Sequence, residues 1–201
     1  MAFAPRGGGT RPRTGRRFGG GARSRTVEEP TSVAAARTRA VGMLSRRDYP
    51  SRALKGRLSQ AGFETEAAEE AVAGLEDERL VDDERYVESA VASRSSRGQG
   101  PVRIAAELRQ SGVAASLIAA AVDARDPRWG ETASALRRRR FGAGAPADAK
   151  ERNRQVRFLL YRGFTGDHVR SALGRAGTDL EDDLEAGAGL DEDAGSDAAG
   201  D

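Results

Sequence analysis

Acidic residues gather in two short runs that could hold a metal ion or supply paired carboxylates for acid–base catalysis. These runs are Glu76-Asp77-Glu78 and Asp82-Asp83-Glu84. Neither has the alternating ligands and the central glycine of an EF-hand loop. Acids at the start of a helix are also favoured by the helix dipole. We therefore interpret the two runs as a solvated turn followed by the first turn of a helix.

Two further features share only part of the pattern of a known site. The turn Gly98-Gln99-Gly100-Pro101 is rich in glycine, but it lacks the Gly-Lys-Ser/Thr of a nucleotide-binding P-loop and follows no predicted strand. We interpret it as an interhelical turn, with anion binding at the following helix N-terminus as the alternative. His168 is the single histidine, and we expect it on the surface. Cysteine is absent, which excludes thiol nucleophiles and disulfides. The sequence therefore predicts no catalytic residue, no metal site and no cofactor, and we expect a protein that is not an enzyme.

Arginine is the most abundant residue in this chain that can bind a charged partner. Of the 33 basic residues only Lys55 and Lys150 are lysines, and guanidinium groups bind phosphates and carboxylates in a fixed, often bidentate geometry. One set flanks the glycine-rich turn and a second lies further along the chain: Arg94, Arg97, Arg103 and Arg109, then Arg137, Arg138, Arg139, Arg140, Arg152, Arg154, Arg157 and Arg162. We predict that both sets contact a polyanion such as DNA or a filament that contains it. The alternative is that arginine simply replaces lysine and solvates the surface.

The charge is distributed unevenly along the chain. Residues 1–32 carry a net charge of +5, residues 33–176 carry +7 and residues 177–201 carry −10, although the whole chain is only +2. Both ends are poor in large apolar residues, so we expect a disordered basic Gly/Arg-rich arm at 1–32 and a disordered acidic tail at 177–201. The arm is either a solvated leader or a phosphate-binding arm. The tail either competes with nucleic acid for the basic region or only aids solubility.

Helices must position the arginines, because apolar residues recur every three or four positions between the two ends and strict alternation is absent. A pattern also repeats: residues 54–63 align with 104–113 without a gap, and a third copy covers 159–164. In each copy a glycine is expected to end one helix in the left-handed conformation, and the apolar residue after it to pack back on that helix. Ser51, Pro101 and Asp148 are predicted to start the middle helices, Ser51 and Asp148 as N-caps.

A further helical stretch precedes each copy, so the chain divides into three-helix units at 33–81, 82–127 and 128–176, the last being the most basic. Units of about fifty residues bury little core alone and are stabilised by stacking on their neighbours. We predict an all-α fold, an elongated and curved array of three tandem three-helix repeats with disordered tails. Trp129 and Tyr161 are expected to anchor the core of the third unit. No apolar run is long enough to span a membrane and no secretory signal is evident, so we expect a cytoplasmic protein.

The ordered motifs across 37–176 resemble the RecX family, the bacterial regulators of the RecA recombinase. The residues that carry the central part of the resemblance are Asp82, Asp83, Arg85, Tyr86, Arg94, Arg97, Gly98, Gly100, Pro101, Arg103, Ile104, Glu107, Leu108, Gly112 and Val113. Residues 44–54 are similar to the first repeat of the family and residues 157–164 to the last. Ala67 and Ala68 depart from the pattern, because larger apolar residues are expected there.

The resemblance implies a regulator without enzymatic activity that lies along the groove of the RecA–DNA filament. It further implies inhibition of RecA strand exchange, ATPase and co-protease activities, and thereby modulation of recombinational repair and of the SOS response. The expected partners are the RecA filament and single-stranded DNA, with double-stranded DNA as a further candidate, and the protein is expected to be a monomer. The alternative is a nucleoid-associated protein that binds DNA directly through its arginine-rich regions.

Overall fold

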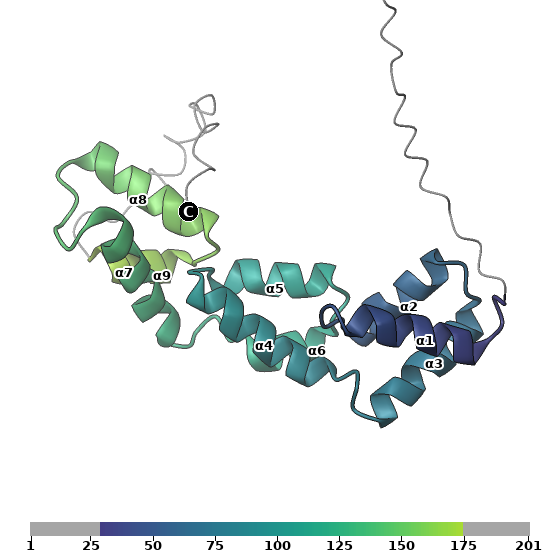
Figure 1. Ribbon diagram of the computed structural model, residues 1–201. Helices are drawn as coiled ribbons and strands as arrows, with labels where there is room; N and C mark the ends of the chain where they lie inside the picture. Colours follow the sequence, from purple (N-terminus) through teal and green to yellow (C-terminus); the bar gives the residue numbers. More distant parts are fainter. Residues whose placement is uncertain (1–28, 175–201) are drawn as a thin grey trace, which may run out of the picture.

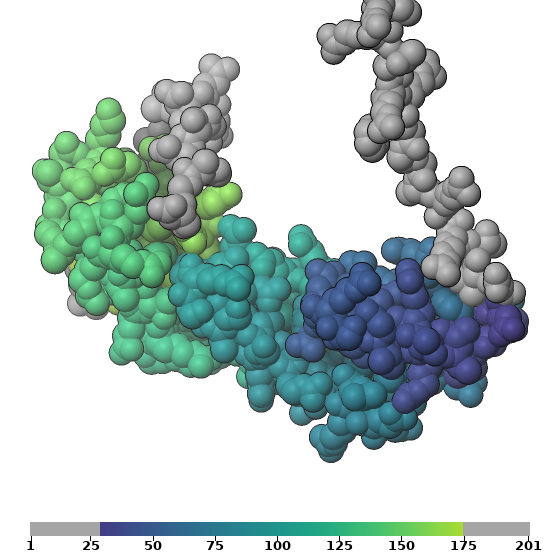
Figure 2. Space-filling view, viewed as in Figure 1, coloured from purple at the N-terminus to yellow at the C-terminus, as the bar shows by residue number. Residues whose placement is uncertain are grey.

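The computed structural model describes residues 29–174, and within this range the chain forms nine α-helices and no strand. The helices are α1 (Val33–Leu44), α2 (Ser51–Gln60), α3 (Thr65–Asp77), α4 (Asp83–Ser96), α5 (Pro101–Gln110), α6 (Ala115–Ala121), α7 (Arg128–Phe141), α8 (Ala149–Tyr161) and α9 (Gly166–Leu173). They pack in three consecutive groups, which we call the first (α1–α3), second (α4–α6) and third (α7–α9) helix groups. Figure 1 shows these groups side by side in an elongated, curved array, and the space-filling view in Figure 2 shows the same curvature. The predicted all-α repeat architecture is confirmed. The predicted disordered arm at 1–32 lies outside the described residues except for 29–32, and the predicted disordered tail at 177–201 lies wholly outside them.

The repeated glycine turns form as the sequence predicts. Gly62, Gly112 and Gly163 have φ values of 103°, 85° and 88°, in the left-handed region that suits glycine. After each glycine, the amide of the apolar residue donates back to a leucine carbonyl five residues earlier: Phe63 to Leu58 at 3.2 Å, Val113 to Leu108 at 3.2 Å and Phe164 to Leu159 at 3.1 Å. Each turn therefore closes its helix and returns an apolar side chain to the core.

The helix starts agree with the sequence at two of three predicted positions. Asp148 caps α8 by accepting a hydrogen bond from the amide of Glu151 at 2.7 Å, and Pro101 is the first residue of α5. Ser51 is not the N-cap of α2, because the cap position is Pro50 and Ser51 is already helical. The Ser51 amide instead donates to Oδ1 of Asp83 at 2.7 Å, and the Ser51 hydroxyl donates to Oδ2 at 3.0 Å. A carboxylate from α4 thus caps α2 and joins the first group to the second.

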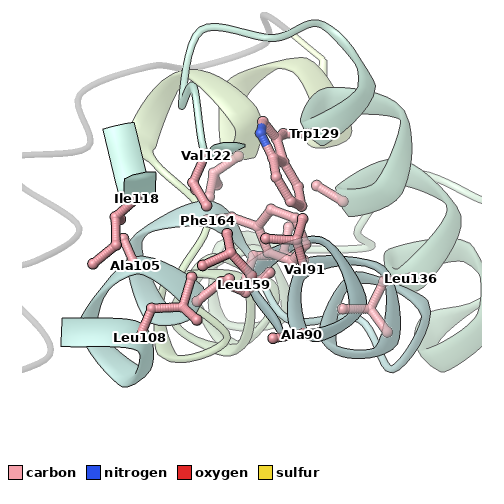
Figure 3. Packing of buried hydrophobic residues seen from close by; sticks show 14 of the residues in the cluster. Ala90, Val91, Ala105, Leu108, Ile118, Val122, Trp129, Leu136, Leu159 and Phe164 are labelled. Carbon is pink, nitrogen blue, oxygen red and sulfur yellow. The ribbon is translucent and has the colours of Figure 1, made fainter. Parts of the chain in front are cut away.

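The apolar residues form two separate cores. One lies among α1, α2 and α3, and includes Leu54, Leu58 and Leu75. The other is continuous through the second and third groups, where Figure 3 shows Val91, Trp129 and Phe164 meeting. The second and third groups are therefore fused by a shared core, whereas the first group has a core of its own.

Four residues singled out in the sequence can be placed relative to these cores. Ala67 and Ala68 are buried, so alanine suffices in the closely packed first group. Trp129 is fully buried, and its Nε1 donates to the carbonyl of Asp123 at 2.9 Å. The prediction for Tyr161 is wrong, because its side chain at the end of α8 is 77% exposed.

None of the helices between residues 29 and 174 is both long and apolar enough to span a membrane.

Candidate arginine-rich interface

Two interhelical turns from different groups meet backbone to backbone. The amide of Gly100, before α5, donates to the carbonyl of Arg162 at 2.8 Å, and the amide of Val102 donates to the carbonyl of Gly163 at 3.1 Å. A Cβ built on Gly100 would lie 2.4 Å from the Gly163 carbonyl, and one on Gly163 would lie 2.4 Å from Cβ of Arg103. Only glycine fits on either side of this contact. The glycine-rich turn is thus an interhelical turn, as predicted, and it fastens the second group to the third.

The backbone contact brings arginines from distant parts of the chain to one junction. Arg162 Nη1 donates to the carbonyl of Arg97 at 3.3 Å, although the two residues are 65 positions apart. The guanidinium of Arg103 lies 5.6 Å from the ring centre of Tyr161, and that of Arg162 lies 5.3 Å from the ring of Phe158. Such cation–π stacking restrains the guanidinium plane and leaves its edge open to a ligand.

Glu107 organises two further guanidinium groups beside the same turn. Its carboxylate accepts from Arg94 Nε at 2.8 Å, from Arg103 Nε at 3.0 Å and from Gln99 Nε2 at 3.2 Å. Burial raises the pKa of Glu107, but the hydrogen bonds from Arg103 and Arg94 lower it by more, so the pKa lies below its usual range. The same Glu107 bond raises the pKa of Arg103. The two arginines remain part-exposed, so one carboxylate orients two cations at the surface.

Arg109 is the member of the first predicted set that the junction does not include. It lies exposed in the last turn of α5, and its side chain makes no hydrogen bond, ion pair or ring contact with another described residue. Of the four arginines that flank the turn in the sequence, the structure therefore brings Arg94, Arg97 and Arg103 together and adds Arg162 from the second set.

The four-arginine run of α7 is divided between the core and the surface. Arg137 is only 6% exposed; its Nε donates to Oε1 of Gln155 at 2.9 Å, and its Nη2 donates to the carbonyl of Gly144. Arg137 is therefore not an exposed contact residue, contrary to the sequence prediction. Successive helical residues turn by about 100°, so a run of four cannot share one face. Arg138, Arg139 and Arg140 are exposed in the last turn of α7.

The arginines of α8 also differ in environment. Arg152 is half-buried, and its Nε is enclosed without a hydrogen-bond partner. Arg154 is exposed; it lies 3.7 Å from Glu151 and 5.4 Å from the ring centre of Phe141. Arg157 is exposed, and its side chain makes no hydrogen bond, ion pair or ring contact with another described residue. Arg154 and Arg157 are thus the α8 arginines most open to a partner.

The net charge of a helix depends on whether it is the second or the third helix of its group. The sequence predictions did not include this pattern. The second helices (α2, α5 and α8) together carry nine Lys or Arg residues and two acids. The third helices (α3, α6 and α9) carry one basic residue and six acids. Figure 1 shows α2, α5 and α8 uppermost in their groups, so the cationic helices recur along one side of the array. A charge count for each helix of the repeat would have revealed this pattern.

Two adjoining clefts between the first and second groups add arginines that the sequence analysis did not select. The larger has a volume of about 550 Å³ and is lined by Arg47, Arg52, Arg57 and Arg94. The guanidinium groups of Arg47 and Arg57 lie 4.4 and 4.9 Å from the ring centre of Tyr49. The smaller cleft, of about 390 Å³, includes Arg94 and Arg97. No spacing in the sequence pairs Arg47 with Arg57, because they come from different elements that both pack on Tyr49.

Asp82, Asp83 and His168, which the sequence offered as candidates for catalysis or metal binding, hold the helices in place. Asp82 caps α4 by accepting from the amide of Arg85 at 2.9 Å, and Asp83 follows in the first turn, as expected. Across residues 29–174 no cluster of acidic and histidine side chains could hold a metal ion. His168 is buried, not on the surface: its Nδ1 accepts from the amide of Thr165 at 3.1 Å and its Nε2 lies 3.0 Å from the carbonyl of Ala124.

Comparisons with known proteins match this chain to one family, in sequence and in fold. The family models for the second and third three-helix domains of RecX match residues 82–122 and 130–173. Regulatory protein RecX of Halorhodospira halophila is 44% identical over 147 residues, covering 73% of this chain and 91% of that protein. Regulatory protein RecX of Stenotrophomonas maltophilia (strain K279a) is 40% identical over 150 residues, covering 75% and 90%. The crystal structure of RecX from Lactobacillus salivarius has the same fold, with a TM-score of 0.61 over 70% of this chain and 93% of that one at 19% identity.

Proposed function

Because this chain belongs to the RecX family, we propose that it is a regulatory protein that binds the RecA–DNA filament and inhibits the recombinase, ATPase and co-protease activities of RecA. Through these activities it modulates recombinational repair and the SOS response in the cytoplasm. Its role is binding, not turnover: a regulator of this kind acts by covering a surface or holding one conformation of the filament.

The observation that carries the proposal is the recurrence of cationic second helices along one side of a curved array. A filament presents the same surface at regular intervals, and a repeat protein presents the same helix at regular intervals. Cations on α2, α5 and α8 complement either DNA phosphates or acidic protein surfaces, and complementary charge speeds and orients association. We propose that the units 33–81, 82–127 and 128–176 each place their second helix against the filament.

The residues that we assign to the contact surface are exposed or part-exposed arginines of α5, of α8, of the junction and of the last turn of α7. They are Arg94, Arg97, Arg103, Arg109, Arg138, Arg139, Arg140, Arg152, Arg154, Arg157 and Arg162. Arg52 and Arg57 of α2 join them, because they line the larger cleft beside Arg94. Arg137 is excluded by its burial.

The alternative function, direct binding of DNA as a nucleoid-associated protein, is favoured by the clefts, where arginines flank the aromatic ring of Tyr49. Bases stack on aromatic rings and on guanidinium planes while phosphates bind arginine. The two functions differ in stoichiometry and in salt dependence.

One assay separates them: RecA-catalysed ATP hydrolysis on single-stranded DNA, with increasing amounts of this protein and at several salt concentrations. Regulation of the filament predicts inhibition at fewer than one protein per RecA protomer. Coating of DNA predicts inhibition only near saturation of the strand, with a steep loss as salt rises. ATP hydrolysis that is unchanged at every ratio would refute the proposed function.

A further inference from the structure

The third helix group carries exposed cations that have no partner within the described structure. Residues 128–173 contain eleven Lys or Arg and four acids. Three of those acids are already engaged: Asp148 caps α8, Glu151 bonds Gln155 and Arg154, and Asp167 bonds Arg170. The exposed side chains without a hydrogen bond, ion pair or ring contact to any residue between 29 and 174 are Arg138, Arg139, Arg140, Lys150 and Arg157.

These five side chains, which we call the free cation set, belong to the last turn of α7 and to α8. Both helices pack on α9, which ends at Leu173. The chain that follows carries ten acids and no basic residue between positions 177 and 201. An anionic segment thus follows, in sequence, the helix that both cationic helices contact. Exposed ion pairs are individually weak and screened by salt, so a stable contact needs several of them at once.

The length of the segment permits the contact. The 27 residues after Gly174 span at most about 90–97 Å when fully extended. The 13-residue helix α8 is only about 20 Å long. A segment tethered this closely reaches a millimolar effective concentration at the surface, so weak pairs suffice.

The other end of the array offers the segment no such attraction. Residues 33–81 contain eight basic and eight acidic residues, and α3 alone carries five acids. Like charges on α3 would repel the segment. Between the two ends of the described array, charge complementarity therefore selects the third group.

We propose that residues 177–201 bind the free cation set of α7 and α8 within the same molecule and compete with external polyanions for it. The competition rests on the proposed function, because the segment would cover part of the surface that we assign to filament binding. The intramolecular contact does not depend on that function. A polyanion must displace the segment before it reaches α8. If the segment covers the surface for about nine-tenths of the time, the apparent dissociation constant of an oligonucleotide rises about tenfold.

The contact can be tested without RecA, because the chain has one tryptophan and no cysteine. Trp129 in α7 serves as the energy donor, and a fluorophore on the variant Ser196→Cys serves as the acceptor. We expect strong energy transfer at low salt and a large loss at about 1 M NaCl, where the Debye length is only about 3 Å. A full-length variant with all ten acids changed to Asn or Gln should show the weaker transfer at both salt concentrations.

Two matched variants locate the contact. Arg138→Gln/Arg139→Gln should reduce the transfer at low salt, whereas Arg39→Gln/Arg46→Gln, which removes two exposed arginines of the first group, should not. Circular dichroism confirms that both retain their helices. Transfer that depends on neither the acids nor salt would overturn the proposal. Energy transfer that is lost on dilution with unlabelled protein would show that the segment binds a second copy of the protein. That result would overturn the proposal of an intramolecular contact.

The consequence for binding is measured with a fluorescent single-stranded oligonucleotide. The full-length protein with the neutralised segment should bind it about tenfold tighter than the natural protein at low salt, and the difference should vanish at high salt. Equal affinities at low salt would refute the competition. The proposed function and this contact can fail separately, since the energy-transfer experiment contains neither RecA nor DNA.

Discussion

Gly100 and Gly163 lie in direct backbone contact, and the Cβ of any other residue at position 100 would fall 2.4 Å from the Gly163 carbonyl. The amides of Gly100 and Val102 donate to the carbonyls of Arg162 and Gly163 across this contact. Two glycines 63 positions apart thus set the distance between the second and third helix groups. The same contact places Arg97, Arg103 and Arg162 at one junction.

Gly100→Ala should therefore destabilise the protein by about 1–3 kcal/mol, the usual cost of forcing atoms into a closely packed site. Urea denaturation followed by circular dichroism measures the change. Gly56→Ala is the matched control, because Gly56 lies inside α2 with no atom within 4 Å of its Cβ position. That substitution should stabilise the protein by about 0.5–1 kcal/mol. Similar effects of the two variants would contradict the tight junction.

Arg137 and Arg138 are neighbours in sequence and should respond differently to substitution. Arg137→Ala removes the partner of Gln155 and of the Gly144 carbonyl, so it should cost about 1–3 kcal/mol of stability. Arg138→Ala removes an exposed side chain and should change stability by less than about 0.5 kcal/mol. Thermal denaturation of the two variants checks the difference, and equal losses would contradict the burial of Arg137.

The ion pairs of Glu107 should make stability depend on pH in the acid range. The pKa of Glu107 is lowered in the folded protein, where the bonds from Arg103 and Arg94 outweigh the effect of burial. The unfolded chain therefore binds this proton more readily, and stability rises with pH. The contribution is fully present above about pH 4.3, the usual pKa of glutamate, and is lost as the pH falls through the lowered pKa.

The difference in unfolding free energy between the natural protein and Glu107→Gln isolates this effect. It should be largest near neutral pH and should shrink towards zero as the solution is acidified. A difference that stays constant from neutral to strongly acid pH would show that the Glu107 charge contributes nothing.

The separate core of the first group predicts that it opens independently of the others. Leu58 is buried in the core of α1–α3, and Leu108 is buried in the core shared by the second and third groups. Leu58→Ala and Leu108→Ala should each cost about 2–5 kcal/mol in the affected part. Hydrogen exchange should accelerate within 33–81 for Leu58→Ala and within 82–173 for Leu108→Ala. Uniform acceleration across all nine described helices in either variant would indicate a single cooperative unit.

The sequence was sufficient for the parts of the fold that depend on local chemistry. Gly62, Gly112 and Gly163 end their helices because a left-handed residue is needed there, and the apolar residue after each returns to the core. The cap at Asp148 is equally local. Ser51 was misassigned because its partner, Asp83, comes from another helix 32 positions away.

The candidate surface was predicted only in part, because burial on a helix depends on what packs against it. Arg137 looks identical to Arg138 in the sequence, and only the position of Gln155 on α8 decides which of the two is enclosed. Tyr161 was expected in the core, but α8 ends with this ring turned to solvent beside Arg103. The larger cleft, beside Tyr49, requires the packing of the first group on the second, which no spacing within either group encodes.

The central claim is that exposed arginines on the cationic side of the array mediate the inhibition of RecA. The most direct test compares the natural protein with Arg154→Glu/Arg157→Glu on α8 and with Arg39→Glu/Arg46→Glu on the first group, in RecA-catalysed ATP hydrolysis on single-stranded DNA at substoichiometric protein. We predict that the natural protein and the first-group variant inhibit hydrolysis equally and that the α8 variant loses most of its inhibition while retaining its helical circular dichroism spectrum. Full inhibition by the α8 variant, or equal loss in both variants, would contradict the claim.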